Sequence, residues 1–230
     1  MKHRPSHWFR NQEVPVIPVG IMEYLEWGGT DFIHMHLVSG GVKPASIVGY
    51  NGDKDENEVQ QWLTNLGVIW RKLEHETDEG VPYAIARDND SFALLNDAIE
   101  GGEHGCYGTA FGFPIDAIQA YNPSASAGKD GNDPSVLMFE VQMYLDGKQS
   151  PDWCAYLQHM PVCSRLLEGE VSCSSVELSK SYMRYIRDNH PKLADEHKKA
   201  HRYKIHVFSH HPKWLKILDD YKQSRNNGSE

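Results

Sequence analysis

The feature that most constrains the fold is a change of hydrophobic period within residues 53–99. Apolar residues first recur at helical spacing, two β-rich runs follow at 68–73 and 81–86, and helical spacing then returns. We therefore predict a helix, a hairpin with a long polar turn and a second helix. The first helical stripe is Val59, Trp62, Leu63 and Leu66, and the second is Leu94, Leu95, Ala98 and Ile99.

The ends of these two helices are marked by acidic residues, short polar residues and glycine. The acidic run at 53–58 suits the positive end of a helix dipole, and Gly67 is placed to end that helix. Asp90 or Ser91 can cap the second helix, because a short side-chain oxygen accepts hydrogen bonds from the free N–H groups of a first turn. On the first stripe we expect Trp62 and Leu63 to be core residues.

Two further short strands are expected before this block. Residues 32–38 are mostly apolar and lie between Gly28-Gly29 and Gly40-Gly41, and turn residues on both sides are typical of a strand. Residues 46–48 form the second short apolar run. These segments would add to the sheet begun by the hairpin.

The C-terminal half has helical spacing. Residues 123–134 are dense in Ser, Gly, Asn and Asp and predict a loop, after which Asp133 can cap and Pro134 can open a helix over 135–145. A buried strand is the alternative for 135–145, because a short apolar run does not distinguish the two. Two later stripes predict helices: Leu178, Tyr182, Tyr185 and Ile186, then Trp214, Ile217, Leu218 and Tyr221.

Together these patterns predict a mixed α/β protein of the α+β class. A small sheet of short strands in the N-terminal half would be packed by helices, and the C-terminal half would be helical. A chain of 230 residues fits one domain, with a loop or subdomain boundary at 122–134 and a flexible tail at 224–230. Hydrophobic residues make up 40% of the chain, which is enough for a sizeable core.

Composition also bears on the compartment. No run approaches the roughly 20 consecutive apolar residues that cross a bilayer, and residues 1–11 lack the apolar core of a signal peptide. The four cysteines lack the close, regular spacing of a disulfide scaffold. We expect a soluble, cytoplasmic protein with reduced thiols and no membrane partner.

Histidines supply the candidate metal ligands. The glycine-rich loops that bind nucleotide phosphates are absent from the sequence, whereas histidine occurs 13 times. In a strand, His34 and His36 would point to the same side, because strand side chains alternate with period two. Two such imidazoles suit a divalent metal such as zinc, as in metal-dependent hydrolases, with a third ligand from elsewhere. An H-x-H pair is also common by chance in a histidine-rich chain.

A second histidine pair has helical spacing. His197 and His201 would lie on one face of a helix, as in a zinc-protease helix. Lys198 stands where such a helix has its catalytic glutamate, and a lysine repels a metal cation. Because the surrounding stretch is rich in lysine, we expect this pair on a solvated polar face.

The middle of the chain resembles an uncharacterised prokaryotic family in which a helix–strand–strand–helix block precedes a histidine, a glycine and a Gly-Tyr-Pro turn, with later Pro-Cys and Cys-x-Ser segments. The resemblance covers residues 45–186 and implies a single α/β unit but no particular reaction. The family carries a cysteine pair soon after the proline, and this chain has residues 115–118 there, without cysteine. The matching positions are His104, Gly108, Gly112-Phe113-Pro114, His159-Met160-Pro161-Val162-Cys163 and Cys173-Ser174-Ser175.

The glycine-rich segment 104–116 is where we expect a functional site. Its glycines cost folding entropy that alanine would avoid, which indicates either a nearby ligand or tight packing. Histidine, carboxylate and thiol groups in and after this segment are of the types used for acid–base and nucleophilic catalysis, although a cysteine is also commonly a small buried residue. The leading hypothesis is an enzyme that acts on a small molecule. Its catalytic candidates are His104, Asp116, His159 and Cys163.

The competing hypothesis is a binding protein without chemistry. Residues 180–225 contain 12 Lys and Arg against 5 Asp and Glu, in a chain whose net charge is −9. Basic side chains interleaved with Tyr203 and Trp214 can neutralise phosphates and stack bases, so the partner would be nucleic acid or an acidic protein. In the alternative, these cations face solvent or pair with the acidic body. The five cations are Lys198, Lys199, Arg202, Lys204 and Lys213.

Overall fold

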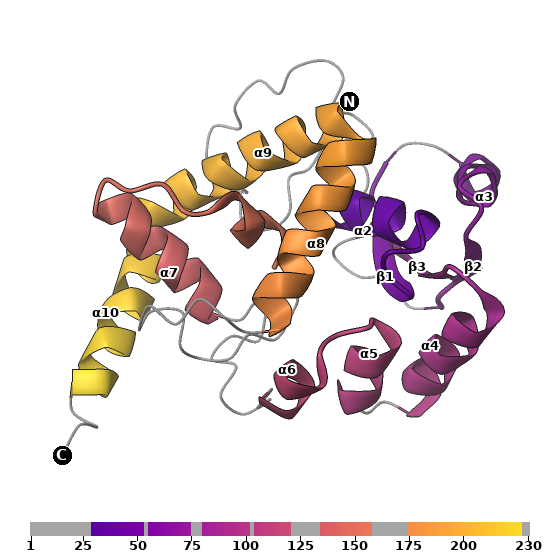
Figure 1. The fold of residues 1–230 in the computed structure, drawn as a ribbon, viewed down its shortest axis with the longest axis horizontal. Helices are drawn as coiled ribbons and strands as arrows, with labels where there is room; N and C mark the ends of the chain where they lie inside the picture. Colours follow the sequence, from indigo (N-terminus) through magenta and orange to yellow (C-terminus); the bar gives the residue numbers. More distant parts are fainter. Residues whose placement is uncertain are drawn as a thin grey trace. The chain divides into compact units, whose positions relative to one another are not determined.

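The computed structural model describes residues 29–52, 55–74, 80–101, 104–120, 134–157 and 174–226. The chain divides into two compact units, residues 1–112 and 113–230, and each is described by itself. The first holds a three-stranded sheet with helices and the second is helical, which confirms the α+β class (Figure 1). The expectation of a single domain stays a prediction.

The elements are as follows. The first unit contains α2 (Thr30–Ser39), β1 (Ala45–Tyr50), α3 (Glu56–Asn65), β2 (Ile69–Lys72), β3 (Val81–Ala86), α4 (Asn89–Gly101) and α5 (His104–Ala110). The second contains α6 (Ile115–Ala120), α7 (Pro134–Leu145), the 3-10 helix η2 (Asp152–Tyr156), α8 (Ser174–Asn189), α9 (Pro191–Ser209) and α10 (Pro212–Asn226).

The sheet has the order β1-β3-β2, and both pairs are antiparallel. The predicted hairpin is therefore β2 and β3, and the expected strand at 46–48 is β1. Gly80, which precedes β3, has a φ of +106°, and a Cβ built there would lie 2.2 Å from the Tyr50 carbonyl oxygen. Only glycine lets the chain approach β1 so closely at this point.

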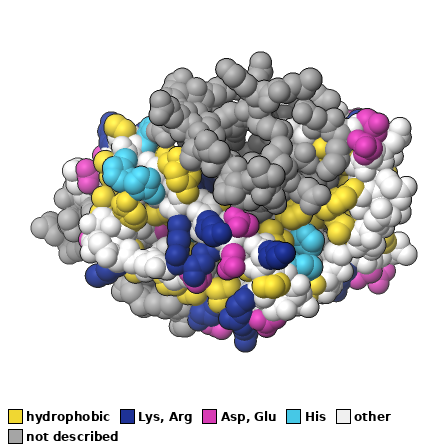
Figure 2. Space-filling model, turned by 90° about the horizontal axis from the view of Figure 1, so that it is seen from above, with side chains coloured by type: hydrophobic (Ala, Val, Ile, Leu, Met, Phe, Trp, Pro, Cys, Tyr) yellow, Lys and Arg dark blue, Asp and Glu magenta, His cyan; other side chains and the backbone are white. Residues whose placement is uncertain are grey.

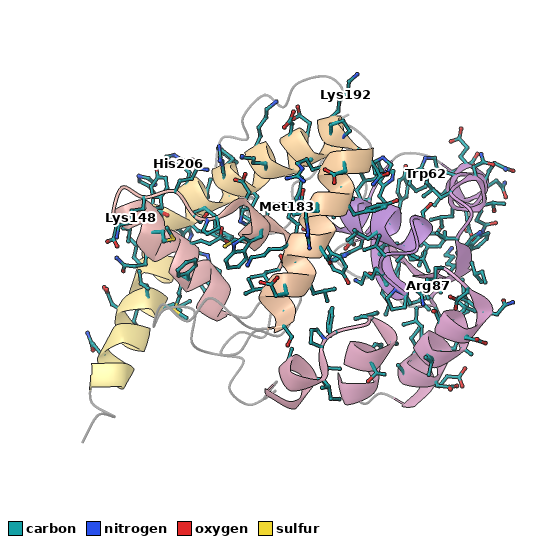
Figure 3. The ribbon with its side chains drawn as sticks, in the orientation of Figure 1. Trp62, Arg87, Lys148, Met183, Lys192 and His206 are labelled. Atoms are coloured by element: carbon teal, nitrogen blue, oxygen red, sulfur yellow. The ribbon has the colours of Figure 1, made fainter. Side chains whose placement is uncertain are left out.

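Helix α3 confirms the first predicted stripe, with one difference. Asp55 caps it in a reciprocal capping box with Glu58, and Gly67 follows its end at a φ of +72°. Val59 and Leu63 are buried, whereas Trp62 is half-buried and stacks on Phe32 with a centroid distance of 5.9 Å (Figure 3). The expectation of a core position is thus confirmed for Leu63, whereas Trp62 is only partly buried.

Helix α4 confirms the second predicted stripe at Leu95, Ala98 and Ile99 but not at Leu94. Asp88, rather than Asp90 or Ser91, caps the helix, since its Oδ1 accepts from the Ser91 N–H at 2.7 Å. Leu94 is 53% exposed, and Phe92 takes its place against the core. Small side chains make up this part of the core and allow helices and sheet to approach closely. The buried cluster is Ala45, Ala84, Ala86, Leu95, Ala98 and Ala110.

The strand expected at 32–38 is wrong, because these residues belong to helix α2. Their apolar run has no clear period, since six of the seven residues 32–38 are buried. A short helix enclosed on all sides cannot be distinguished from a buried strand by hydrophobic pattern alone. The flanking glycines mark the ends of a helix here, and Gly29 has a φ of +71°.

The second unit is built around α9. Helix α7 packs against it, and α8 packs against both α9 and η2 (Figure 1). The predicted helices at 135–145, before His190 and near the C-terminus are all confirmed, and the strand alternative for 135–145 is wrong. Pro191 opens α9, where a missing N–H costs nothing.

On the face shown in the space-filling view, charged side chains of both signs lie among apolar ones (Figure 2). Within the described ranges, no helix is long and apolar enough to cross a membrane.

Candidate functional site

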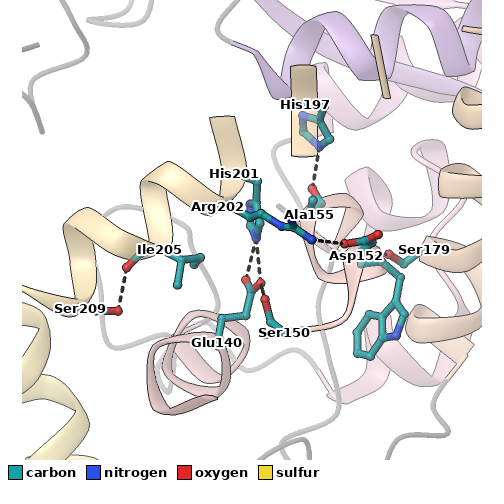
Figure 4. A network of polar contacts seen from close by, with 11 residues as sticks. Glu140, Ser150, Asp152, Ala155, Ser179, His197, His201, Arg202, Ile205 and Ser209 are labelled. Atoms are coloured by element: carbon teal, nitrogen blue, oxygen red, sulfur yellow. Dashed lines mark hydrogen bonds and ion pairs between the residues drawn. The ribbon is translucent and has the colours of Figure 1, made fainter. Parts of the chain in front are cut away.

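The most distinctive polar group in the second unit is a buried carboxylate. Glu140 on α7 is 2% exposed, and His201 on α9 is 8% exposed. His201 Nε2 lies 2.8 Å from Glu140 Oε1 and 2.9 Å from Oε2, and the Ser150 hydroxyl donates to Oε1 at 2.8 Å (Figure 4). A carboxylate accepts hydrogen bonds, so Nε2 of His201 carries a hydrogen and is the donor.

Local structure explains why these groups meet. Positions 197, 201 and 205 of α9 follow helical spacing, so their side chains share the face that packs inside the unit, and all three are buried. Glu140 is the one charged residue in the apolar helix α7, and α7 packs on α9. Ser150 comes after a turn at Gly147, whose φ is +68°.

His197 is a second buried imidazole, one helical turn before His201. Its Nε2 donates to the Ala155 carbonyl at 3.0 Å, and its ring meets Tyr156 edge-on at 4.9 Å. Burial lowers the pKa of His197 to about 3, although the hydrogen bond to Ala155 opposes this shift. The ring is therefore neutral at physiological pH. The expected solvated face for His197 and His201 is wrong, because both lie inside the unit.

The outer edge of the network carries charge. Asp152 in η2 accepts from Lys198 Nζ. It also accepts from Arg202 Nη2 at 3.2 Å (Figure 4). The three side chains are between 38% and 45% exposed. One carboxylate thus ties η2 to two successive turns of α9 at the surface. Lys199, between them, pairs with Glu196 on its own helix.

Burial keeps two other ionisable side chains of this unit, Cys154 and Tyr182, in their protonated forms. Cys154 in η2 is fully buried, and burial together with the charge of Glu140 raises the pKa of its thiol far above the usual range. A protonated thiol is a poor nucleophile. Burial also raises the pKa of Tyr182, whose hydroxyl has no hydrogen-bond partner among the described residues.

The first unit has a buried cluster of its own around Lys43, which is 2% exposed. Its Nζ lies 3.2 Å from His34 Nδ1 and 3.1 Å from Ser46 Oγ, and 5.1 Å from the centroid of the Phe111 ring. Burial lowers the pKa of Lys43 to about 7, and the charge of Asp31 opposes this shift in part.

The geometry assumed for a metal site at His34 and His36 is wrong. In helix α2, residues two apart lie about 200° apart around the axis, so the imidazoles do not share a side. His34 contacts Lys43, and His36 meets the Phe32 ring edge-on at 4.8 Å. Across the described ranges, no group of three or more His, Cys, Asp or Glu residues is arranged to hold a metal ion.

The side chains of the four residues predicted to be catalytic lie outside the described residues. His104 opens α5 in the first unit and Asp116 lies in α6 of the second, and their side chains are outside the described residues. His159 and Cys163 are also outside them. At Gly112, where φ is +73°, a Cβ would lie 2.7 Å from the Pro44 side chain, so packing accounts for this glycine. The four candidates stay predictions.

Sequence reasoning missed Glu140, Ser150 and Lys43. For Glu140 a signal was present, because a single carboxylate in an otherwise apolar helix must be either solvated or paired inside. Ser150 and Lys43 gave no comparable signal.

Comparison with models of protein families, with curated proteins and with solved structures gives no significant match to this chain. The resemblance to the prokaryotic family is therefore neither supported nor contradicted and stays a prediction.

Proposed function

We propose that the protein is an enzyme that acts on a small molecule by general acid–base catalysis, with His201 as the proton carrier. The observation that carries the proposal is the approach of His201 Nε2 to both oxygens of the enclosed Glu140, at 2.8 and 2.9 Å. A carboxylate in this position orients an imidazole, fixes its tautomer and stabilises the imidazolium that forms when the ring takes a proton.

The surroundings of the pair support this role. Ser150 holds Oε1 of Glu140, so the carboxylate has a fixed orientation of its own. His197, whose ring centroid is 6.5 Å from that of His201, is neutral and does not repel an imidazolium at His201.

A purely structural role is the alternative for the same pair, since it also joins α7 to α9. Removing one partner of a buried hydrogen-bonded pair destabilises a fold whether or not the pair is catalytic. Loss of stability therefore does not distinguish the two roles. Loss of turnover in a folded variant does.

The test is untargeted mass spectrometry of a small-molecule extract incubated with the full chain. Wild type is expected to deplete one compound and accumulate another, and Glu140→Gln and His201→Gln to slow that conversion by at least about 100-fold. Glu177→Gln, on the exposed part of α8, is the matched control and should convert at the wild-type rate. Circular dichroism confirms that each variant is folded.

A second readout is chemical rescue. Added imidazole is expected to restore part of the turnover of His201→Gly under conditions in which circular dichroism shows that variant to be folded already. An effect of imidazole on folding alone would not produce this result. Equal conversion by wild type and folded His201→Gln would overturn the proposal, as would the absence of conversion by wild type. The same assay applied to His104, Asp116, His159 and Cys163 tests the candidates predicted from sequence.

Docking of nucleic acid or an acidic partner is the second candidate. Lys204 lies over the Phe208 ring and Lys213 over Trp214, so basic and aromatic groups do adjoin. However, Lys198, Lys199 and Arg202 each pair with a carboxylate, which a phosphate would have to displace. Retention on nucleic acid that falls steeply with salt would support this candidate, and no retention at low salt would remove it.

A further inference from the structure

A second group of histidines lies at the C-terminal end of α9, on the surface. His206 and His210 are both exposed and are four residues apart, and their ring centroids are 4.6 Å apart. Tyr144 on α7 is 38% exposed and packs edge-on against both rings. Figure 3 labels His206 on the outer side of α9.

In both imidazoles, Nδ1 is already engaged. His210 Nδ1 donates to the His206 carbonyl at 2.8 Å, because a carbonyl oxygen only accepts. His206 Nδ1 lies 2.6 Å from the Tyr144 hydroxyl. In a neutral His210, the lone pair is therefore on Nε2, and no described residue hydrogen-bonds to Nε2 of either ring. Metal-binding histidines have this arrangement, with the second nitrogen held by a carbonyl or another polar group.

The spacing of the rings fits a shared ion. A metal–nitrogen bond of about 2.0–2.1 Å puts the metal about 3.2 Å from a ring centroid, so two imidazoles at about 90–110° have centroids about 4.5–5.2 Å apart. The observed separation of 4.6 Å lies within this range. Histidines at i and i+4 of a helix form a recurring pair of zinc ligands.

We propose that His206 and His210 form a binding site for one divalent transition-metal ion of the zinc type. Nε2 of each ring supplies a ligand, water completes the coordination, and Tyr144 orients the His206 ring. Imidazole ligands favour zinc, copper and nickel over magnesium and calcium, which defines the class of ion. The site goes beyond the proposed catalytic pair and does not depend on it.

The test uses Zn²⁺ alone with the metal-free full chain, carrying no histidine tag. Isothermal titration calorimetry measures affinity, and long-range ¹H–¹⁵N NMR of the histidine rings identifies the bound nitrogens. We expect the Nε2 signals of His206 and His210 to shift together with one equivalent of Zn²⁺. His206→Gln and His210→Gln are each expected to weaken this site at least about 10-fold, and Tyr144→Phe about 10-fold through the lost orientation.

His211→Gln is the matched control. His211 is the next residue, but its Nδ1 accepts from the Lys213 N–H at 3.3 Å and it takes no part in the proposed site. The affinity of the His211→Gln variant for Zn²⁺ should differ from that of wild type by less than about 2-fold. Zinc shifts confined to other histidines, or an unchanged titration in a folded His206→Gln/His210→Gln variant, would overturn the proposal. The absence of saturable binding would overturn it as well.

Discussion

Each of the two units encloses a polar cluster that contains a histidine, but the central ionisable group and its hydrogen-bond partners differ between the two clusters. In the first unit the central group is the amine of Lys43, whose hydrogen bonds to His34 and Ser46 go to neutral acceptors. In the second unit it is the carboxylate of Glu140, which receives hydrogen bonds from His201 and Ser150.

This difference has a physical consequence. Burial lowers the pKa of Lys43 to about 7, because neutral acceptors and the charge of Asp31 replace only part of the hydration that the ammonium loses. Glu140 instead has both oxygens within 2.9 Å of an imidazole N–H donor. The first unit thus holds a group that changes its charge near neutral pH, and the second holds an oriented pair.

Removing the carboxylate gives the largest expected effect. Glu140→Ala removes the acceptor of both His201 and Ser150, and we expect the free energy of unfolding to fall by about 2–6 kcal/mol, because each buried donor left unsatisfied costs about 1–3 kcal/mol. Glu140→Gln keeps the shape and one acceptor and should cost about 1–2 kcal/mol. Urea titrations followed by the methyl NMR signals of Val141 and Ile205 measure both. Equal, small losses would show that the pair is not the central contact of this unit.

The next effect concerns Lys43. The amine is neutral in the folded state above its pKa of about 7 but binds a proton up to 10.5 in the unfolded state, so unfolding takes up a proton between these values. Stability of the first unit should therefore rise with pH from 7 to 9, by roughly 1 kcal/mol per pH unit. Lys43→Met removes the group and should flatten this dependence, measured by the Ile47 and Ile85 methyl signals in urea.

Lys72→Met is the matched control for this experiment. Lys72 lies in the same unit but pairs with Glu56 at the surface, where its side chain is 38% exposed. Its replacement should leave the slope between pH 7 and 9 unchanged. A wild-type protein with no slope in this window would mean that Lys43 stays charged when buried.

The third effect has the same sign in a different pH window. His197 has a folded-state pKa of about 3 and an ordinary value of 6.5, so the unfolded state binds the proton first as pH falls. The free energy of unfolding of the second unit should not change through His197 above pH 6.5, and it should decrease by about 1 kcal/mol per pH unit below pH 6.5. His197→Gln can still donate to Ala155 and should decrease less between pH 6.5 and 5. The exposed His210→Gln is the control and should behave as wild type.

The first unit shows what periodicity can and cannot predict. Amphipathic helices and a half-buried hairpin have clear periods, so α3, β2, β3 and α4 could be predicted. Helix α2 could not, because burial on nearly all sides removes its period. Side-chain exposure at a given position, as for Leu94, depends on how far the neighbouring core extends.

The candidate site was harder to predict for a related reason. Glu140, Ser150 and His201 are distant in sequence, and only the packing of α7 on α9 brings them together. The neighbouring residues in the sequence led to a wrong prediction for His201, since the lysines around it indicated a solvated face. Those lysines do lie outside, but one turn of helix separates buried from exposed positions.

The smallest effect tests whether burial, rather than pairing, makes the difference between strong and weak contacts. Asp152 receives two cations, Lys198 and Arg202, yet all three side chains are at least 38% exposed. Water screens such pairs, so Asp152→Asn should lower the free energy of unfolding by less than about 1 kcal/mol, and by less still in 0.5 M salt, where the Debye length is about 4–5 Å. Asp188→Asn, which removes the pairing with Arg187 at a position 59% exposed, should cost nothing measurable. The Ile186 and Ile205 methyl signals in urea report both variants at low and high salt. A loss for Asp152→Asn that equals the Glu140→Ala loss and does not respond to salt would contradict this argument, because the number of partners, and not their removal from water, would then determine the strength of the contact.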